Sequence, residues 1–228
     1  MTGGAVEFAT APAALRTALE QAMEIATANV PALPGRTVVA VDVSGSMRAP
    51  VTGHQKGSTS KATCLDVAAV LAAAVLRQNR SARVIPFHDR VVHVKLDARA
   101  SIARTAERLR ELPSGGTNCS AALALLNQQR EHVDTMIYCS DNQSWVDAHP
   151  GGRSAAMLTE WRSLKRRCPG AQLVCIDVQP YTTVQAPVAE DVTHVGGFSD
   201  QVFEVLRAVA DGDRSPDRFV ERIRAIAI

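Results

Sequence analysis

The stretch Val38–Met47 constrains the fold of this chain more than any other. It reads Val-Val-Ala-Val-Asp-Val-Ser-Gly-Ser-Met, so that an apolar and mostly β-branched run leads directly into Asp42. A continuous apolar run of this kind is typical of a strand buried on both faces of a parallel sheet. Because open α/β sheets bind their ligands at the carboxyl ends of the strands, the segment predicts a ligand site there. Asp42 brings a carboxylate to this site, and Ser44 and Ser46 bring two hydroxyls.

Strand-like runs and helical patterns alternate along the rest of the chain. This alternation predicts an α/β fold with a doubly wound, mostly parallel sheet and helices on both faces. The runs Ala82–Phe87 and Val91–Leu96 are interpreted as a hairpin, which would place one antiparallel strand at a sheet edge. The other predicted strands are Thr135–Ser140, Gln172–Val178 and Asp191–Val195. The predicted helices are Pro12–Asn29, Thr63–Gln78, Ser101–Leu112, Cys119–Arg130, Ser154–Arg167, Gln201–Val209 and Pro216–Ile226.

The size of the chain indicates one α/β domain with an addition before it. At 228 residues, with 46% hydrophobic and 21% charged residues, the chain is long enough for one such domain with a full core. The helix Pro12–Asn29 precedes the first strand, and two prolines and Gly35 follow it. We therefore expect residues 1–34 to form a tail and a helix, and residues 35–228 to form the α/β domain.

Charge, hydropathy and cysteine usage exclude several classes of protein. The net charge of +2 indicates no broad basic surface for nucleic acid. No apolar run approaches the roughly 20 residues of a membrane span, and no signal peptide opens the chain, so we expect no membrane association. Five cysteines are an odd number, and Cys139 and Cys175 lie in strand-like runs. We therefore expect buried free thiols in a reducing compartment, which places the protein in the cytoplasm.

Three separate segments bring oxygen ligands to the same predicted edge of the sheet. Asp42, Ser44 and Ser46 follow the first strand, Thr117 follows a Gly-Gly turn, and Asp141 follows the strand Thr135–Ser140. Carboxylates and hydroxyls are hard donors, which favours Mg²⁺, with Ca²⁺ or Mn²⁺ as alternatives. Because few carboxylates would contact the ion directly, we expect the site to bind one further acidic group.

These segments together resemble the metal-ion-dependent adhesion site (MIDAS) of a von Willebrand factor A domain. The resemblance rests on Asp-x-Ser-x-Ser at Asp42, a later Gly-Gly-Thr at Thr117, and Ser-Asp at Asp141. It implies a Rossmann-like sheet and a metal site in which the serines and the threonine bind the ion. The aspartates of that family often act through water, and the carboxylate of a protein partner completes the metal shell.

The chain is most similar to the A domain that ends proteins of the Ro ribonucleoprotein (TROVE) family. Shared features include Gly115–Ser120, Ser140–Trp145 and Gly196-Gly197-Phe198, and the resemblance extends from about Leu15 to Asp211. Asn118 stands where that family usually has aspartate. The family's ring of helical repeats, which binds RNA, is missing, and the helix Pro12–Asn29 within residues 1–34 is the one candidate for a remnant of it. We therefore expect a fragment or a stand-alone relative, with small non-coding RNA bound through a separate helical-repeat module.

A basic cluster offers a second candidate site, for phosphate or RNA. It comprises Arg162, Lys165, Arg166 and Arg167 at the end of a predicted helix. The alternative interpretation is a solvated helix end whose positive charge complements the helix dipole. The six histidines form no H-x-x-x-H pair, and we interpret them as structural or surface residues.

A metal-dependent phosphate-ester hydrolase is the alternative to a binding module. Phosphatases that form an aspartyl-phosphate need a second acid two residues after the nucleophile, and Ser44 occupies that position. The chain also lacks the G-x-S-x-G motif of serine hydrolases and a P-loop of the required spacing. We therefore expect a binding protein and not an enzyme.

Overall fold

The computed structural model describes residues 12–27, 30–52, 61–141, 153–179, 191–199 and 201–212. Within these residues, five strands form one sheet in the order β2-β1-β3-β4-β5, and every neighbouring pair is parallel. The strands are β1 (Thr37–Asp42), β2 (Arg83–Phe87), β3 (Thr135–Ser140), β4 (Gln172–Asp177) and β5 (Val192–Gly196). The α/β fold and the parallel sheet are as predicted.

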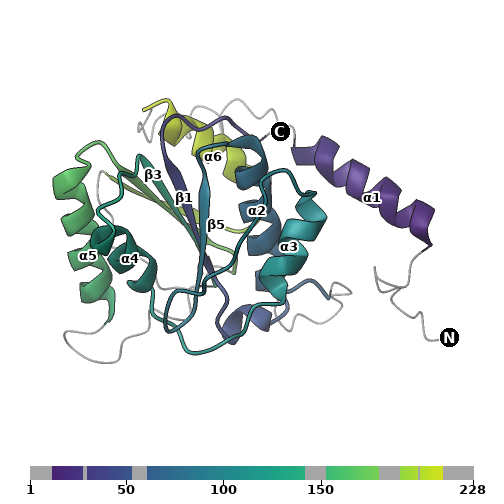
Figure 1. Cartoon of the computed structure of the whole chain (residues 1–228), viewed down its shortest axis with the longest axis horizontal. Coiled ribbons are helices and arrows are strands. Elements are labelled where there is room, and N and C mark those ends of the chain that lie inside the picture. Colours follow the sequence, from purple (N-terminus) through teal and green to yellow (C-terminus); the bar gives the residue numbers. More distant parts are fainter. Residues whose placement is uncertain are drawn as a thin grey trace, which may run out of the picture.

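Helices cover both faces of the sheet (Figure 1). They are α1 (Ala13–Ala26), α2 (Cys64–Gln78), α3 (Ile102–Arg110), α4 (Ala121–Gln128), α5 (Arg153–Arg167) and α6 (Gln201–Ala210), with a short 3-10 turn at Ser46–Arg48. Successive side chains of a strand point to opposite faces, and in β1 Val39 and Val41 pack with α2, α3 and α6. Val38 and Ala40 pack with α4 and α5 in a second core cluster. Burial on both faces explains why β1 reads as a continuous apolar run.

The prediction of an antiparallel strand at the sheet edge is wrong. β2 lies at the sheet edge and runs parallel to β1, and Val91–Leu96 forms no strand but a single antiparallel bridge from Val91 to Phe87. Val92 N–H donates to the carbonyl of Pro86. An antiparallel pair continues when the two residues exchange both backbone hydrogen bonds, and proline has no N–H with which to return one. The pairing therefore stops after one bridge.

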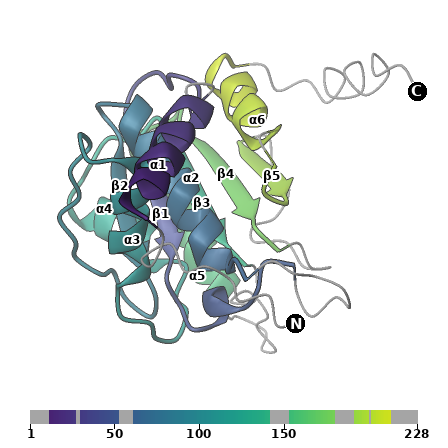
Figure 2. The same cartoon turned by 90° about the vertical axis from the view of Figure 1, so that its right-hand side faces the viewer.

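The first helix, α1, stands outside the two core clusters. None of its residues is buried, and it is the outermost helix on the side of α2 and α3 (Figures 1 and 2). Glu24 joins it to the domain by pairing with Arg77 of α2 and accepting a hydrogen bond from Ile102 N–H at the start of α3. The predicted helix Pro216–Ile226 lies outside the described residues.

Two further expectations concern the cysteines and the membrane. All five cysteines are free and buried, as predicted. Among the helices that the structure describes, none has the length and apolar character needed to cross a bilayer.

Candidate metal centre

The centre is built around Asp42, the last residue of β1, whose exposed fraction is 0%. Ser44 N–H donates to Asp42 Oδ1 at 2.8 Å, so the chain turns back on the carboxylate directly after the strand. Ser140 Oγ, at the end of β3, donates to Asp42 Oδ2 at 2.9 Å. Both carboxylate oxygens therefore have a donor, which fixes the orientation of the side chain.

The two loops that carry the predicted hydroxyl ligands are in contact. Gly45 N–H donates to the carbonyl of Gly115 at 3.2 Å, which brings the loop of Thr117 to the loop after β1. Ser44 Oγ and Ser46 Oγ lie 3.1 Å apart. Ser44 is buried, whereas Ser46 and Thr117 are partly exposed.

A second buried carboxylate, Asp141, follows β3, the neighbour of β1 in the sheet. Burial raises the pKa of Asp42 to about 6, and the negative charge of Asp141 adds to the increase, while hydrogen bonds from Ser44 and Ser140 oppose it. Burial and the same charge raise the pKa of Cys64, at the start of α2, to about 11. The structure therefore brings two buried aspartates close enough to affect each other's ionisation.

The donor set fits a hard divalent cation. Buried like charges are costly unless a proton or a cation compensates them. Two carboxylates and three hydroxyls from Ser44, Ser46 and Thr117 are oxygen donors of the kind that Mg²⁺, Ca²⁺ and Mn²⁺ accept. No group of three or more His, Cys, Asp or Glu residues that could hold a metal occurs in the part of the chain that the structure describes. An ion at this centre would therefore depend on the hydroxyls.

Two residues that support the centre were missed by sequence reasoning. Ser140 holds Asp42, and its signal was its place at a strand end directly before Asp141. His88 is buried beside the Gly-Gly turn, where a Cβ on Gly115 would lie 2.8 Å from His88 Nδ1. The carbonyl of His88 also accepts a hydrogen bond from Asn118 N–H at 2.7 Å, so this histidine positions the second loop.

Asn118, the departure from the family pattern, binds within its own loop. Its Oδ1 accepts hydrogen bonds from the N–H of Ser120 at 3.2 Å and from the hydroxyl of Ser120 at 2.8 Å, just before α4. An amide oxygen makes these bonds without adding a negative charge to this loop.

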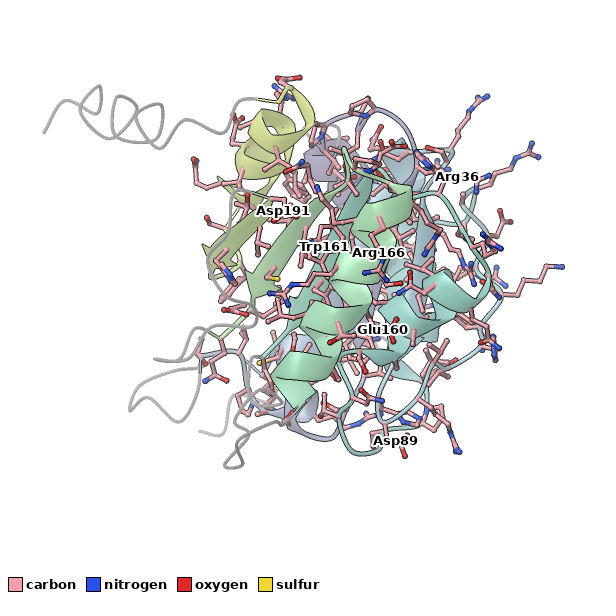
Figure 3. The ribbon with its side chains drawn as sticks, turned by 90° about the vertical axis from the view of Figure 1, so that its left-hand side faces the viewer. Arg36, Asp89, Glu160, Trp161, Arg166 and Asp191 are labelled. Atoms are coloured by element: carbon pink, nitrogen blue, oxygen red, sulfur yellow. The ribbon has the colours of Figure 1, made fainter. Side chains whose placement is uncertain are left out.

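The predicted RNA contacts do not lie at the centre. The basic end of α5 leads directly into β4, so it lies at the amino end of that strand, whereas the metal centre lies at the carboxyl ends of the strands (Figure 3). Lys165 Nζ donates to the carbonyl of Ala171 at 2.9 Å, lies 3.4 Å from the Asp191 carboxylate and stacks 5.9 Å from the Trp161 ring centre.

The other three basic residues of this cluster differ in their exposure. Arg167 is partly buried and donates to the carbonyls of Ser163 and Leu126. Arg162 and Arg166 are exposed. Two members of the basic cluster, Lys165 and Arg167, therefore have structural contacts, and two remain open to a ligand.

A family model and two individual proteins that match this chain all point to the same family. The family model described as the Ro60 vWA domain matches residues 36–210. The chain is 26% identical over 197 residues to the RNA-binding protein RO60 of Deinococcus radiodurans, covering 86% of this chain and 35% of that protein. Its identity to the Caenorhabditis elegans RNA-binding protein RO60 is also 26%, with 86% of this chain and 29% of that protein covered.

A solved structure agrees with the sequence comparisons. The crystal structure of the Deinococcus radiodurans RO (RSR) protein superposes with a TM-score of 0.68 at 25% identity, over 88% of this chain and 39% of that chain. The chain therefore spans about a third of the length of the relatives that it matches.

Proposed function

The chain belongs to the Ro60 vWA domain family, and from this premise we propose that it is a metal-ion-dependent binding module of a Ro60-like RNA-binding protein. In this proposal the ion is Mg²⁺, with Ca²⁺ or Mn²⁺ as alternatives, and it is held by Asp42, Ser44, Ser46, Thr117 and Asp141. A bound cation would supply positive charge and an open coordination position for an anionic group of a partner.

The observation that carries the proposal is the pair of buried carboxylates, Asp42 and Asp141. Both side chains have an exposed fraction of 0%, and each negative charge makes the other less favourable. Burying two carboxylates together destabilises a fold, because removing each ionised group from water costs several kcal/mol in proteins. A divalent cation would offset that cost.

The hydroxyl ligands determine the kind of partner that we expect. We propose that Ser44, Ser46 and Thr117 contact the ion directly through neutral oxygens and that the two aspartates act through water, so no anionic group of the chain touches the ion. The side chain of an acidic protein partner is therefore the preferred ligand, and an RNA phosphate is the second choice. The partly exposed positions of Ser46 and Thr117 leave this side of the centre open to solvent.

We propose a binder and not an enzyme because the chain has no acid two residues after Asp42, the position at which phosphatases that form an aspartyl-phosphate carry their general acid. The position two residues after Asp42 is Ser44, whose hydroxyl is 3.1 Å from that of Ser46. A serine hydroxyl does not protonate a leaving group at neutral pH, which general acid catalysis requires.

We also propose that this chain binds RNA, on the basis of its similarity to the two RNA-binding proteins RO60. Arg162 and Arg166 are the exposed members of the basic cluster. With a net charge of +2, we expect weak, salt-dependent binding in the non-specific range of roughly 10⁻⁴–10⁻⁶ M. Titration of structured RNA at two salt concentrations, with wild type and an Arg162→Gln, Arg166→Gln double variant, tests this.

The metal assignment is tested by thermal unfolding in a Mg²⁺ titration. Wild type should gain stability as Mg²⁺ rises, by about 2.7 kcal/mol at a hundred times the Kd, because the ion binds only the folded state. Asp42→Asn should show no gain. Asp66→Asn is the matched control, because Asp66 pairs with Arg110, accepts a hydrogen bond from Thr63 N–H and is not among the proposed ligands.

The control should melt at a lower temperature and yet respond to Mg²⁺ like wild type. An equal Mg²⁺ response in wild type and Asp42→Asn would contradict the assignment of the centre.

A further inference from the structure

Three loops meet at the amino ends of the strands, whereas the metal centre lies at their carboxyl ends. They precede β1, β3 and β4. Asp134 N–H donates to the carbonyl of Arg36 at 2.9 Å, and Gln172 N–H donates to the carbonyl of Asp134 at 2.9 Å, so the backbone joins all three. Figure 3 shows Arg36 at this end and Asp89, in a loop after β2, at the other.

These loops align a thiol, an imidazole and a carboxylate in series. Cys168 Sγ lies 3.5 Å from His132 Nδ1, and His132 Nε2 lies 3.0 Å from Asp134 Oδ1. Arg36 N–H donates to the other oxygen, Asp134 Oδ2, at 2.7 Å. Cys168 lies 36 positions after His132, which is two positions before Asp134, and no sequence motif links the thiol to the other two.

The hydrogen bonds determine where the protons lie. Burial alone would raise the pKa of Asp134, but the hydrogen bonds from Arg36 N–H and His132 hold it below its ordinary value. An ionised carboxylate only accepts, so His132 Nε2 carries the hydrogen. In a neutral imidazole the other nitrogen, Nδ1, then has a free lone pair, and it faces Cys168 Sγ. The thiol therefore has a base positioned to take its proton.

Three other thiols of the chain are buried as Cys168 is, and what Cys168 has beside it is an imidazole nitrogen 3.5 Å from its sulfur. Burial raises the pKa of Cys139 to about 12, and burial with the charge of Asp141 raises that of Cys64 to about 11. Burial also raises the pKa of Cys175 well above its ordinary value. These thiols stay protonated at neutral pH, and protonated thiols are poor nucleophiles.

Access to Cys168 limits the size of a reagent. The residue is 2% exposed, whereas the His132 side chain beside it is 61% exposed. Pro169 and Gly170, which follow Cys168, are exposed, and a Cβ on Gly170 would meet nothing within 4 Å. Because the sulfur is nearly covered, a reagent has to be small, and the exposed imidazole marks the side from which we expect it to approach.

We propose that Cys168, His132 and Asp134 form a peroxide-reactive thiol site, independent of the metal centre. His132 Nδ1 takes the proton of the Cys168 thiol, and the thiolate sulfur attacks one oxygen of hydrogen peroxide. The O–O bond breaks as the S–O bond forms, and the departing hydroxide takes the proton from His132 to leave as water. The sulfur is oxidised to sulfenic acid, and the peroxide is reduced: Cys–SH and H₂O₂ give Cys–SOH and H₂O.

The test treats the full chain with hydrogen peroxide in the presence of a chelator and traps sulfenic acid with dimedone, a cyclic 1,3-diketone. Peptide mass spectrometry then locates the adduct and follows its rate. In wild type the adduct should form first on Cys168. His132→Gln should slow its formation about tenfold or more, as expected for loss of a general base. His93→Gln, at an exposed loop position, is the matched control and should react like wild type.

Further variants separate a chemical role of His132 from a structural one. Added imidazole should restore the rate in His132→Ala, whose melting temperature should match that of wild type because the side chain is mostly exposed. Asp134→Asn should also slow the reaction, and if it unfolds the protein the His132 variants decide alone. Equal rates in wild type and His132→Gln, or adducts on the other cysteines as fast as on Cys168, would overturn the proposal.

Discussion

At the carboxyl ends of the strands, Asp42 has an exposed fraction of 0%, and burial raises its pKa to about 6. At the amino ends, Asp134 has a side chain that is 44% exposed, and hydrogen bonds hold its pKa below the ordinary value despite partial burial. Asp42 has a second buried carboxylate, Asp141, beside it, whereas Asp134 has the N–H of Arg36 and an imidazole. The pKa of a carboxylate is therefore raised at one end of the sheet and lowered at the other.

The difference shows where the fold loses and gains free energy. Ionising Asp42 destabilises the metal-free native state, because the charge is easier to solvate in the unfolded chain. Ionising Asp134 stabilises the native state, because its partners exist only there. A site that destabilises the fold when no ligand is bound is a candidate for ligand binding. A carboxylate whose charge is compensated by hydrogen-bond donors of the chain can instead hold a neighbouring side chain in one orientation.

Gly35→Ala should have the largest effect, and it acts at the amino end. Gly35 has φ +74°, and a Cβ there would lie 2.2 Å from Asp134 Oδ2 and 2.9 Å from Asp134 Cβ. We expect a loss of about 3 kcal/mol, from backbone strain and from displacing the charged partner of Arg36 N–H. Urea unfolding measures the loss.

The matched control for Gly35→Ala is Gly197→Ala, just after β5. Gly197 has φ +94°, but a Cβ there would meet nothing within 4 Å. It should therefore lose only the conformational part, about 1–2 kcal/mol. Equal losses in both variants would mean that the Asp134 side chain moves aside without a cost in stability, and that its hydrogen bonds do not fix its position.

Asp42→Asn should have the next largest effect, with the opposite sign. The pKa of Asp42 rises from 3.8 to about 6 on folding, so the native state holds more protons between these values, and stability falls as pH rises through this window. The amide can still accept from Ser44 N–H and can donate to the Ser140 hydroxyl. At pH 8 with a chelator, we expect Asp42→Asn to be about 2 kcal/mol more stable than wild type.

Denaturant unfolding at several pH values checks this prediction. The advantage of Asp42→Asn should shrink as pH falls and disappear below about pH 4, where wild type is protonated in both states. Saturating Mg²⁺ should also remove it, because only wild type binds the ion. A variant less stable than wild type at every pH would show that the carboxylate is not a cost to the metal-free fold.

Asp134→Asn should have a smaller effect, of the ordinary sign. A depressed folded-state pKa contributes stability above the unfolded value of 3.8, and this contribution is lost as pH falls through the folded pKa. Because the side chain is 44% exposed and water screens its interactions, we expect a loss of only about 1 kcal/mol at pH 7. Unfolding at pH 7 and near pH 3 should show the difference from wild type shrinking in acid, and a constant difference would contradict it.

The sheet could be predicted because β1, β3 and β4 are buried on both faces, which makes each an apolar run with a clear beginning and end. The edge strand could not. The alternation in Val91–Leu96 suits a strand, but pairing depends on a reciprocal bond that Pro86 cannot make, and sequence periodicity does not reveal which residues would be opposite one another.

The candidate ligands could be named because each follows a strand or a glycine turn, and the parallel sheet places Asp42 and Asp141 at the ends of the neighbouring strands β1 and β3. The supporting contacts could not be foreseen. Ser140 holds Asp42 because β3 is the neighbour of β1. Cys168 meets His132 because the loops before β3 and β4 share one edge. Strand order determines both contacts, and it is a tertiary property with no local sequence signal.

Thr117→Val should have the smallest effect on stability and the most specific effect on binding. Thr117 is partly exposed, so loss of its hydroxyl should change the unfolding free energy by no more than about 0.5 kcal/mol. If the hydroxyl is a metal ligand, calorimetry should show Mg²⁺ affinity falling by about tenfold or more. Thr17→Val is the matched control, because Thr17 is exposed on α1 and its hydroxyl donates only within that helix, to the carbonyl of Ala13. A pulldown from native extract should recover an acidic partner with wild type and with the control in Mg²⁺, and with neither in chelator. Equal recovery by Thr117→Val would exclude the metal centre as the docking surface.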